Sequence, residues 1–168
     1  MRKIPALLSQ NALAEKLVSL AREKNITFGT AESCTGGLIS ASVTDVPGAS
    51  AAFFGGVVSY DNSVKRGILG VQTETLERFG AVSEETAREM ANGALKVLGV
   101  DFTVAVTGIA GPGGGTPKKP VRLVYIAAAS DKGVTVSENH FDGDREAVRL
   151  QTVQKALSLL IEKVKNEA

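Results

Sequence analysis

The sequence predicts a single α/β domain of three layers, α/β/α, with helices on both faces of a mixed sheet. Segments with helical spacing of apolar residues alternate with short apolar segments typical of buried strands, in the order α-β-α-β-α-α-β-β-β-α. The segments 121–130 and 134–141 are separated only by Asp131-Lys132-Gly133, which predicts a hairpin and so an antiparallel pair. A length of 168 residues fits one domain over residues 1–168.

The first half of the chain alternates helices and strands. Residues 8–24 carry apolar positions on one helical face, and "ITFGTA" (26–31) is typical of a buried strand. A helix is predicted through "GLISASVTDV" (37–46), since the turn signal Pro47-Gly48 follows it. "AAFFGGVVSY" (51–60) predicts a second strand, with a glycine pair that favours a bulge or a close backbone approach.

The second half adds helices before the hairpin and one long helix after it. "NSVKRGILG" (62–70) predicts a short helix or turn, and "TETLERFG" (73–80) a helix closed by its glycine. In 83–99, Ser83 is a good N-cap, and the two glutamates after it suit the helix dipole. "DFTVAVTG" is an apolar strand, and 144–165 is a long helix with Asp144 as its expected cap.

The composition excludes several function classes. The formal net charge of +1 gives no electrostatic footprint for nucleic acid or membrane, and no apolar run is long enough to span a bilayer. The lone cysteine permits no internal disulfide, which favours a cytoplasmic location. One His and one Cys cannot make a common zinc site. We therefore expect no metal and no cofactor.

The stretch "TAESCTGG" (30–37) places a hydroxyl and a thiol where a strand turns into a helix. Ligands of open α/β sheets bind beyond the carboxyl ends of the strands, and helix N–H groups there can hold an oxyanion or a phosphate. Ser33 is thus a candidate nucleophile, and Gly36 and Gly37 would admit a ligand close to the backbone. Alternatively, Ser33 or Thr35 is simply the N-cap, and Cys34 a buried small hydrophobe.

A serine nucleophile needs a base, and the chain offers few. A Ser-His-Asp triad would have to use His140, the only histidine. "SYDNSVKRG" (59–67) follows the second strand and supplies Tyr60 and Lys65; a lysine whose pKa is lowered by burial can serve as the base. The alternative is a solvated surface lysine, with Tyr60 covering the core.

Two further stretches carry glycines and arginines. "VTGIAGPGGGTPKKP" (106–120) is too rich in glycine and proline for regular structure, and its N–H groups could form an anion nest, although no Walker motif is present. The alternative is a flexible connection. In "FDGDREAVRLQ", Arg145 and Arg149 lie one turn apart on one helical face and could clamp a phosphate or carboxylate, or simply make surface ion pairs.

Together, "TAESCTGG", "VVSYDNSVKRGILGV", "GAVSEETAREMANGAL", "VAVTGIAGPGGGTPKKPV" and "GDREAVRLQ" resemble the CinA C-terminal domain, the nicotinamide mononucleotide deamidase family, from about residue 8 onward. The resemblance is to a stand-alone form without the separate N-terminal domain. It implies an amidohydrolase of pyridine nucleotide salvage that converts nicotinamide mononucleotide to nicotinic acid mononucleotide and ammonia.

The resemblance also implies the roles of individual residues: Ser33 as nucleophile, Lys65 as its base and Tyr60 as their support. It assigns the substrate pocket to two segments of the chain, Thr35, Gly36 and Gly37 in the first and Thr107, Gly108, Ala110 and Gly111 in the second, with Arg145 on the phosphate. Arg122 departs from the family, which commonly has a small residue, often Gly, after Pro-Val. A small-molecule nucleotide as partner and a homo-oligomer are expected on the same basis. A non-catalytic nucleotide-binding module and a thiol enzyme using Cys34 are the alternatives.

Overall fold

The computed structural model describes residues 4–168, with side chains from residue 11 onward. Five strands form one sheet: β1 (Phe28–Glu32), β2 (Phe53–Val58), β3 (Phe102–Gly108), β4 (Leu123–Ser130) and β5 (Gly133–His140). Their spatial order is β2-β1-β3-β4-β5. β1 pairs in parallel with both β2 and β3, whereas β3–β4 and β4–β5 are antiparallel. The mixed sheet and the hairpin are therefore confirmed.

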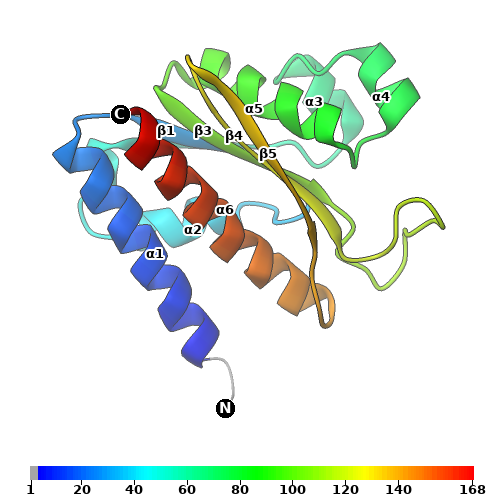
Figure 1. Ribbon diagram of the computed structural model, residues 1–168, viewed down its shortest axis with the longest axis horizontal. Coiled ribbons are helices and arrows are strands. Elements are labelled where there is room, and N and C mark those ends of the chain that lie inside the picture. The colour runs from blue at the N-terminus through cyan, green and yellow to red at the C-terminus, as the bar shows by residue number, and fades with distance from the viewer. Residues whose placement is uncertain (1–3) are drawn as a thin grey trace.

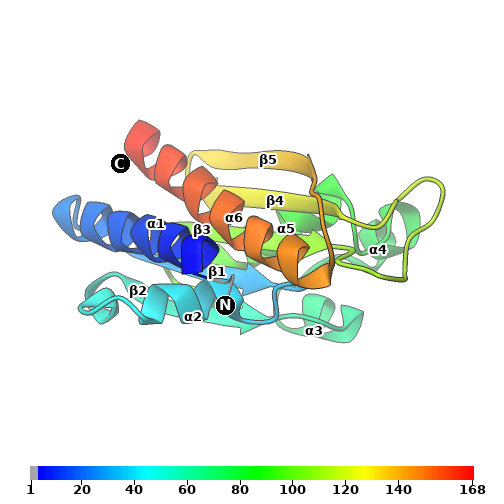
Figure 2. The same cartoon turned by 90° about the horizontal axis from the view of Figure 1, so that it is seen from below.

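Helices cover both faces of this sheet, as Figures 1 and 2 show. On one face lie α1 (Ile4–Glu23), α2 (Leu38–Thr44) and α6 (Arg145–Glu167), which contact one another. On the other face α5 (Glu84–Leu98) packs across β1, β3, β4 and β5, with α4 (Thr73–Phe79) against it and α3 (Asn62–Gly67) nearby. The three-layer α/β/α architecture is thus confirmed, and the segment 62–70 begins as a true helix.

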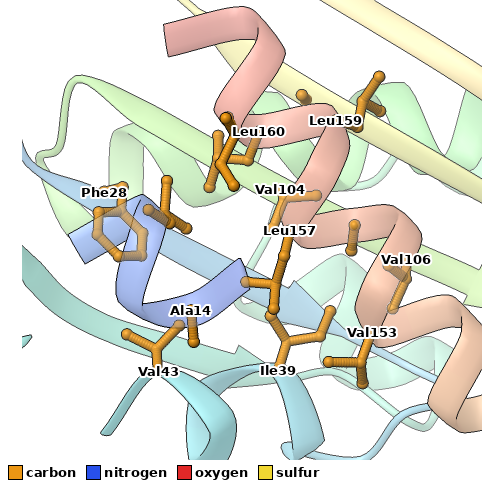
Figure 3. Packing of buried hydrophobic residues seen from close by; sticks show 14 of the residues in the cluster. Ala14, Phe28, Ile39, Val43, Val104, Val106, Val153, Leu157, Leu159 and Leu160 are labelled. Atoms are coloured by element: carbon orange, nitrogen blue, oxygen red, sulfur yellow. The ribbon is translucent and has the colours of Figure 1, made fainter. Parts of the chain in front are cut away.

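The larger core cluster lies between the sheet and α1, α2 and α6. Figure 3 shows residues from the sheet and these helices meeting there, with Phe28 and Val104 from the sheet opposite Leu157 and Leu160 of α6. All four are fully buried. Burying a side chain of this size stabilises the fold by about 1.5–3 kcal/mol. This layer therefore fixes β1 and β3, which carry the residues described below.

The predicted helix caps Ser83 and Asp144 are confirmed, and Asp61 is a cap that was not predicted. Ser83 Oγ accepts from the Thr86 N–H at the start of α5, and an Asp144 carboxylate oxygen accepts from the Ala147 N–H at the start of α6. Asp61 caps α3 through the Ser63 N–H at 2.8 Å. Each such cap typically contributes about 1 kcal/mol. Within residues 4–168, none of the helices has the length and apolarity needed to cross a bilayer.

Candidate active site

Ser33 and Lys65 meet at the edge of the sheet where β1 and β2 end. Ser33 follows the last residue of β1, and Lys65 lies in α3, which follows β2. The Lys65 Nζ lies 3.2 Å from Ser33 Oγ. It also donates to the main-chain carbonyls of Ser59 at 2.8 Å and Tyr60 at 3.0 Å. The amine donates to Ser33 Oγ in this arrangement; a neutral amine that keeps its two protons on the two carbonyls would have its lone pair available to the Ser33 hydroxyl.

Lys65 is buried, with 1% of its surface exposed, and so is not a solvated surface lysine. Burial lowers its pKa below the ordinary value for lysine, while the negative charge of Asp61 acts in the opposite direction. Within the described residues no carboxylate forms an ion pair with Lys65. Burial thus shifts the protonation equilibrium of Lys65 toward the neutral amine, which is the form a base requires.

Cys34 is next to Ser33 and lines the same pocket, but its thiol differs from the Ser33 hydroxyl in what it needs in order to react. Its side chain is buried, and burial raises the pKa of the thiol to about 11. The charge of Lys65 lowers this pKa, but only as a minor influence beside burial. The thiol therefore stays protonated at neutral pH, which matches the interpretation of Cys34 as a small buried hydrophobe.

Glu32 is a buried residue at this site that the sequence analysis missed. Its carboxylate accepts from the N–H groups of Gly37, Ile39 and Ser40 at 3.0, 3.1 and 2.8 Å. The hydroxyls of Thr35 and Ser40 donate to it at 2.7 and 2.8 Å. Glu32 thus occupies the N-terminus of α2. The sequence feature that could have identified it is an acid at the end of an otherwise apolar strand. A carboxylate buried there requires several hydrogen-bond donors nearby.

This carboxylate changes the interpretation of the loop after Ser33. The expected oxyanion or phosphate site on the helix N–H groups is wrong, because Glu32 fills it. Neither Ser33 nor Thr35 is the N-cap, which is Gly37. Thr35 is fully buried, and Gly36 and Gly37 adopt φ of 60° and 102° in the turn. None of these three residues lines the pocket beside Ser33, so the structure does not bring them to the candidate substrate position.

The pocket beside Ser33 has a volume of about 200 Å³. Ser33, Tyr60, Lys65, Thr107, Gly108, Ala110 and Arg145 line it, so seven of the predicted site residues converge there. The Thr107 hydroxyl donates to the Ala81 carbonyl at 2.7 Å, which fixes the rim. A Cβ on Gly108 would lie 2.6 Å from a methyl of Val124, so a larger residue would not fit there.

Tyr60 and Arg145 form the outer side of this pocket. The Tyr60 side chain is exposed, and its hydroxyl lies 3.4 Å from a guanidinium nitrogen of Arg145. Arg145 also donates to the Gly111 carbonyl at 2.9 Å. Gly111 itself does not line the pocket. Tyr60 supports Lys65 through its main-chain carbonyl rather than through its ring.

Arg149 does not join Arg145 as a phosphate clamp. Its guanidinium donates to the carbonyls of Cys34 and Thr35 at 3.2 and 3.0 Å, so it ties α6 to the loop after Ser33. His140 is also absent from the pocket: it lies at the end of β5, paired with Glu138 at 2.9 Å. The pocket therefore contains no histidine that could act as the base.

Asn62, Ala81 and Val82 line the pocket although the sequence analysis did not select them. Asn62 is an exposed residue one turn before Lys65 on α3, and it is among the residues that line the pocket. Its position in the first turn of α3, directly after the capping residue Asp61, is the sequence feature that could have identified it. A larger hollow of about 520 Å³ lies at the opposite end of the parallel strands, beside Phe102, and shares no residue with Ser33 and Lys65.

Comparisons with known proteins identify the family to which the chain belongs. The family model for the CinA C-terminal domain matches residues 10–164. The chain belongs to the CinA C-terminal domain family. It is 55% identical over 155 residues to a CinA-like protein from Leptospira borgpetersenii, a match that covers 92% of this chain and 37% of that protein. A putative competence-damage inducible protein from Acetivibrio thermocellus is 54% identical over 138 residues, covering 82% of this chain and 33% of that protein.

Solved structures of the family share the fold. The competence/damage inducible protein CihA from Agrobacterium tumefaciens has a TM-score of 0.89 at 47% identity, covering 92% of this chain and 94% of that one. The competence damage-inducible protein A from Klebsiella pneumoniae has a TM-score of 0.91 at 33% identity, covering 95% and 99%. The chain spans about 37% of the length of the first curated relatives it matches. The three-layer fold is therefore that of CinA superfamily proteins.

Proposed function

We propose that this CinA-family domain is an amidohydrolase that converts nicotinamide mononucleotide to nicotinic acid mononucleotide and ammonia. The observation that carries the proposal is the 3.2 Å contact between Lys65 Nζ and Ser33 Oγ, with the amine held by two main-chain carbonyls. A serine beside a buried lysine of lowered pKa is an activated nucleophile. The resemblance of the surrounding motifs to the deamidase family supplies the substrate.

The first half-reaction forms an ester on Ser33. Its Oγ attacks the carboxamide carbon while the Ser33 proton passes to neutral Lys65. The Lys65 ammonium then protonates the amide nitrogen, the C–N bond breaks, and ammonia leaves. The positive pyridinium ring makes the attached carboxamide more electrophilic. The proton that Ser33 gave up thus departs with the ammonia, and Lys65 is neutral again.

The second half-reaction returns the enzyme to its starting state. Water attacks the Ser33 ester and gives a proton to Lys65. Lys65 then returns that proton to the Ser33 oxygen as the acid is released. Each addition places negative charge on the carbonyl oxygen, which needs a hydrogen-bond donor. We assign this role to the Asn62 side-chain amide, because Glu32 already uses the N–H groups of α2 and the Thr107 hydroxyl already donates to the Ala81 carbonyl.

The test is ammonia release from nicotinamide mononucleotide by the purified protein without added metal. We expect one ammonia per nicotinic acid mononucleotide formed, and no release by Ser33→Ala. A folded parent protein that binds the nucleotide but releases no ammonia would instead support a non-catalytic nucleotide-binding module.

A further inference from the structure

A second hollow of about 420 Å³ adjoins the pocket that holds Ser33 and Lys65. The two share Ala110 and Arg145, so they adjoin at these residues. The second hollow lies between the loop that connects β3 to β4 and the turn that precedes α6. In Figure 1 this loop extends from the sheet beside the start of α6.

The volumes indicate that the two hollows serve one ligand. Sites for small molecules usually measure about 300–1,000 Å³, and the Ser33 pocket alone, at about 200 Å³, is below this range. It can hold a ring and its carboxamide. The neighbouring 420 Å³ brings the combined space well into the range, so the rest of a mononucleotide extends past Arg145 into the second hollow.

Arg122 lines this second hollow in an unusual backbone conformation. Its φ is 79°, in the left-handed region that glycine adopts more readily. Hydrogen bonds hold it there, because its N–H donates to the Ile109 carbonyl at 2.6 Å and its carbonyl accepts from the Phe141 N–H at 3.1 Å. The residue is exposed, and within the described residues its guanidinium has no hydrogen-bond or ion-pair partner. A strained residue with an unused charge beside a candidate active site suggests a binding role.

Arg145 and two carboxylates complete the polar lining. Arg145 uses two of its donors on Gly111 and Tyr60, which leaves others available. Asp144 already accepts from the Ala147 N–H as the cap of α6, and Glu146 also lines the hollow. These two acids offset part of the positive charge. A second guanidinium beside Arg145 would therefore strengthen the binding of a phosphate dianion.

We propose that the second hollow binds the 5′-phosphate of the substrate between Arg122 and Arg145, and that Arg122 determines the preference for phosphorylated ligands. The inference rests on the proposed function for the identity of the nucleotide. Guanidinium groups suit phosphate because their planar donors match its oxygens in pairs. The carboxamide then faces Ser33 while the phosphate lies beyond Arg145.

The decisive variant is Arg122→Gly, because glycine accepts the φ of 79° and the fold is expected to keep its melting temperature. The measurement is calorimetric binding of nicotinic acid mononucleotide, which is not turned over, and of nicotinic acid riboside, which lacks the phosphate. Loss of a charge-assisted hydrogen bond weakens binding roughly 10- to 150-fold. We expect this loss for the mononucleotide and no change for the riboside. Lys118→Ala, on the same exposed loop, is the charge-matched control and should leave both affinities unchanged.

The subsite would be overturned by any of three results. Arg122→Gly weakens the binding of both ligands equally, Arg122→Gly leaves mononucleotide binding unchanged, or the parent does not bind the mononucleotide. Arg122→Lys keeps the charge but loses the paired donors, so it should fall between parent and glycine variant. The two proposals fail separately. If Arg122→Gly weakens only mononucleotide binding and the parent releases no ammonia, the subsite stands and the amidase proposal fails. If the parent releases ammonia and Arg122→Gly binds the mononucleotide as tightly as the parent does, the amidase proposal stands and the subsite fails.

Discussion

Replacing Lys65 with methionine keeps the apolar stem and removes the amine that faces Ser33. The catalysed release of ammonia should fall by about 10²- to 10⁴-fold, the usual contribution of a positioned general base. In the parent protein, kcat/KM should rise with pH as Lys65 loses its proton. Because burial lowers the pKa of Lys65, the midpoint of this rise should lie below about 10.4, the ordinary value for lysine.

The same substitution has a stability effect with two parts. The carbonyls of Ser59 and Tyr60 lose their donor, which costs about 1–3 kcal/mol each at any pH if they stay buried. The second part depends on pH. Since the pKa of Lys65 is lower in the folded protein, the unfolded chain binds more protons between the folded value and about 10.4, and the parent gains stability as pH rises through that window.

The gain amounts to about 1.36 kcal/mol for each pKa unit by which folding lowers the value. Lys65→Met has no such group, so its stability should not change with pH in this way. The free energy of unfolding of the parent minus that of the variant should therefore increase from neutral pH toward about pH 10.4. Urea denaturation of both proteins at several pH values measures this difference directly. Lys163→Met is the control, because Lys163 is also buried but belongs to α6 and pairs with Glu167 at 2.7 Å.

The reasoning fails if Lys65→Met retains near-normal activity, since the lining of the pocket includes no histidine, carboxylate or second lysine. It also fails if the stability difference narrows as pH rises, because that would mean that the fold stabilises the charged amine. The control should remain active, which separates the loss of the base from the loss of any buried lysine.

Four further outcomes are expected. Ser33→Ala should abolish ammonia release while Cys34→Ala keeps most of it, as measured on variants whose circular dichroism matches the parent; equal loss in both would favour a thiol mechanism. Asn62→Ala should lower kcat by about 10²- to 10³-fold with little change in fold stability, whereas an unchanged kcat would place the oxyanion donor elsewhere. Glu32→Gln should break at least two hydrogen bonds to a buried carboxylate oxygen, about 3 kcal/mol or more, and lower the melting temperature by about 6–12 °C; a melting temperature equal to that of the parent would contradict the structural role of Glu32. Activity should survive a strong chelator, because the chain has one His and one Cys; loss that a divalent ion restores would count against the Ser–Lys mechanism.

The order of helices and strands could be predicted because each element has its own local signal. Ser83 and Asp144 are capping residues directly before amphipathic segments, and both cap the helices expected of them. The convergence of Ser33 and Lys65 followed from a general rule about parallel strands, which place their carboxyl ends at one edge. Their 3.2 Å contact did not follow from the rule, since it depends on where α3 places Lys65 relative to the end of β1.

The sequence alone did not reveal how the polar groups are shared. Thr35 and Gly37 carry donors that could bind a ligand, but in the fold these donors are hydrogen-bonded to the Glu32 carboxylate. Arg149 has the same spacing from Arg145 that a phosphate clamp would need, yet it donates to the carbonyls after Ser33. Such competition is decided by three-dimensional distances, and a motif records only which residue types are present.

The adjacent hydroxyl and thiol at positions 33 and 34 can now be distinguished by what each reaction requires. A thiol enzyme needs the thiolate, and burial raises the pKa of Cys34 to about 11, so the reactive form is scarce at neutral pH. A serine does not ionise before it attacks, because its proton leaves during the attack if a base is in contact. Lys65 provides that contact for Ser33, and the Ser59 and Tyr60 carbonyls orient it. The same burial that keeps the thiol protonated also favours a neutral amine, so one apolar environment disables Cys34 and activates Ser33.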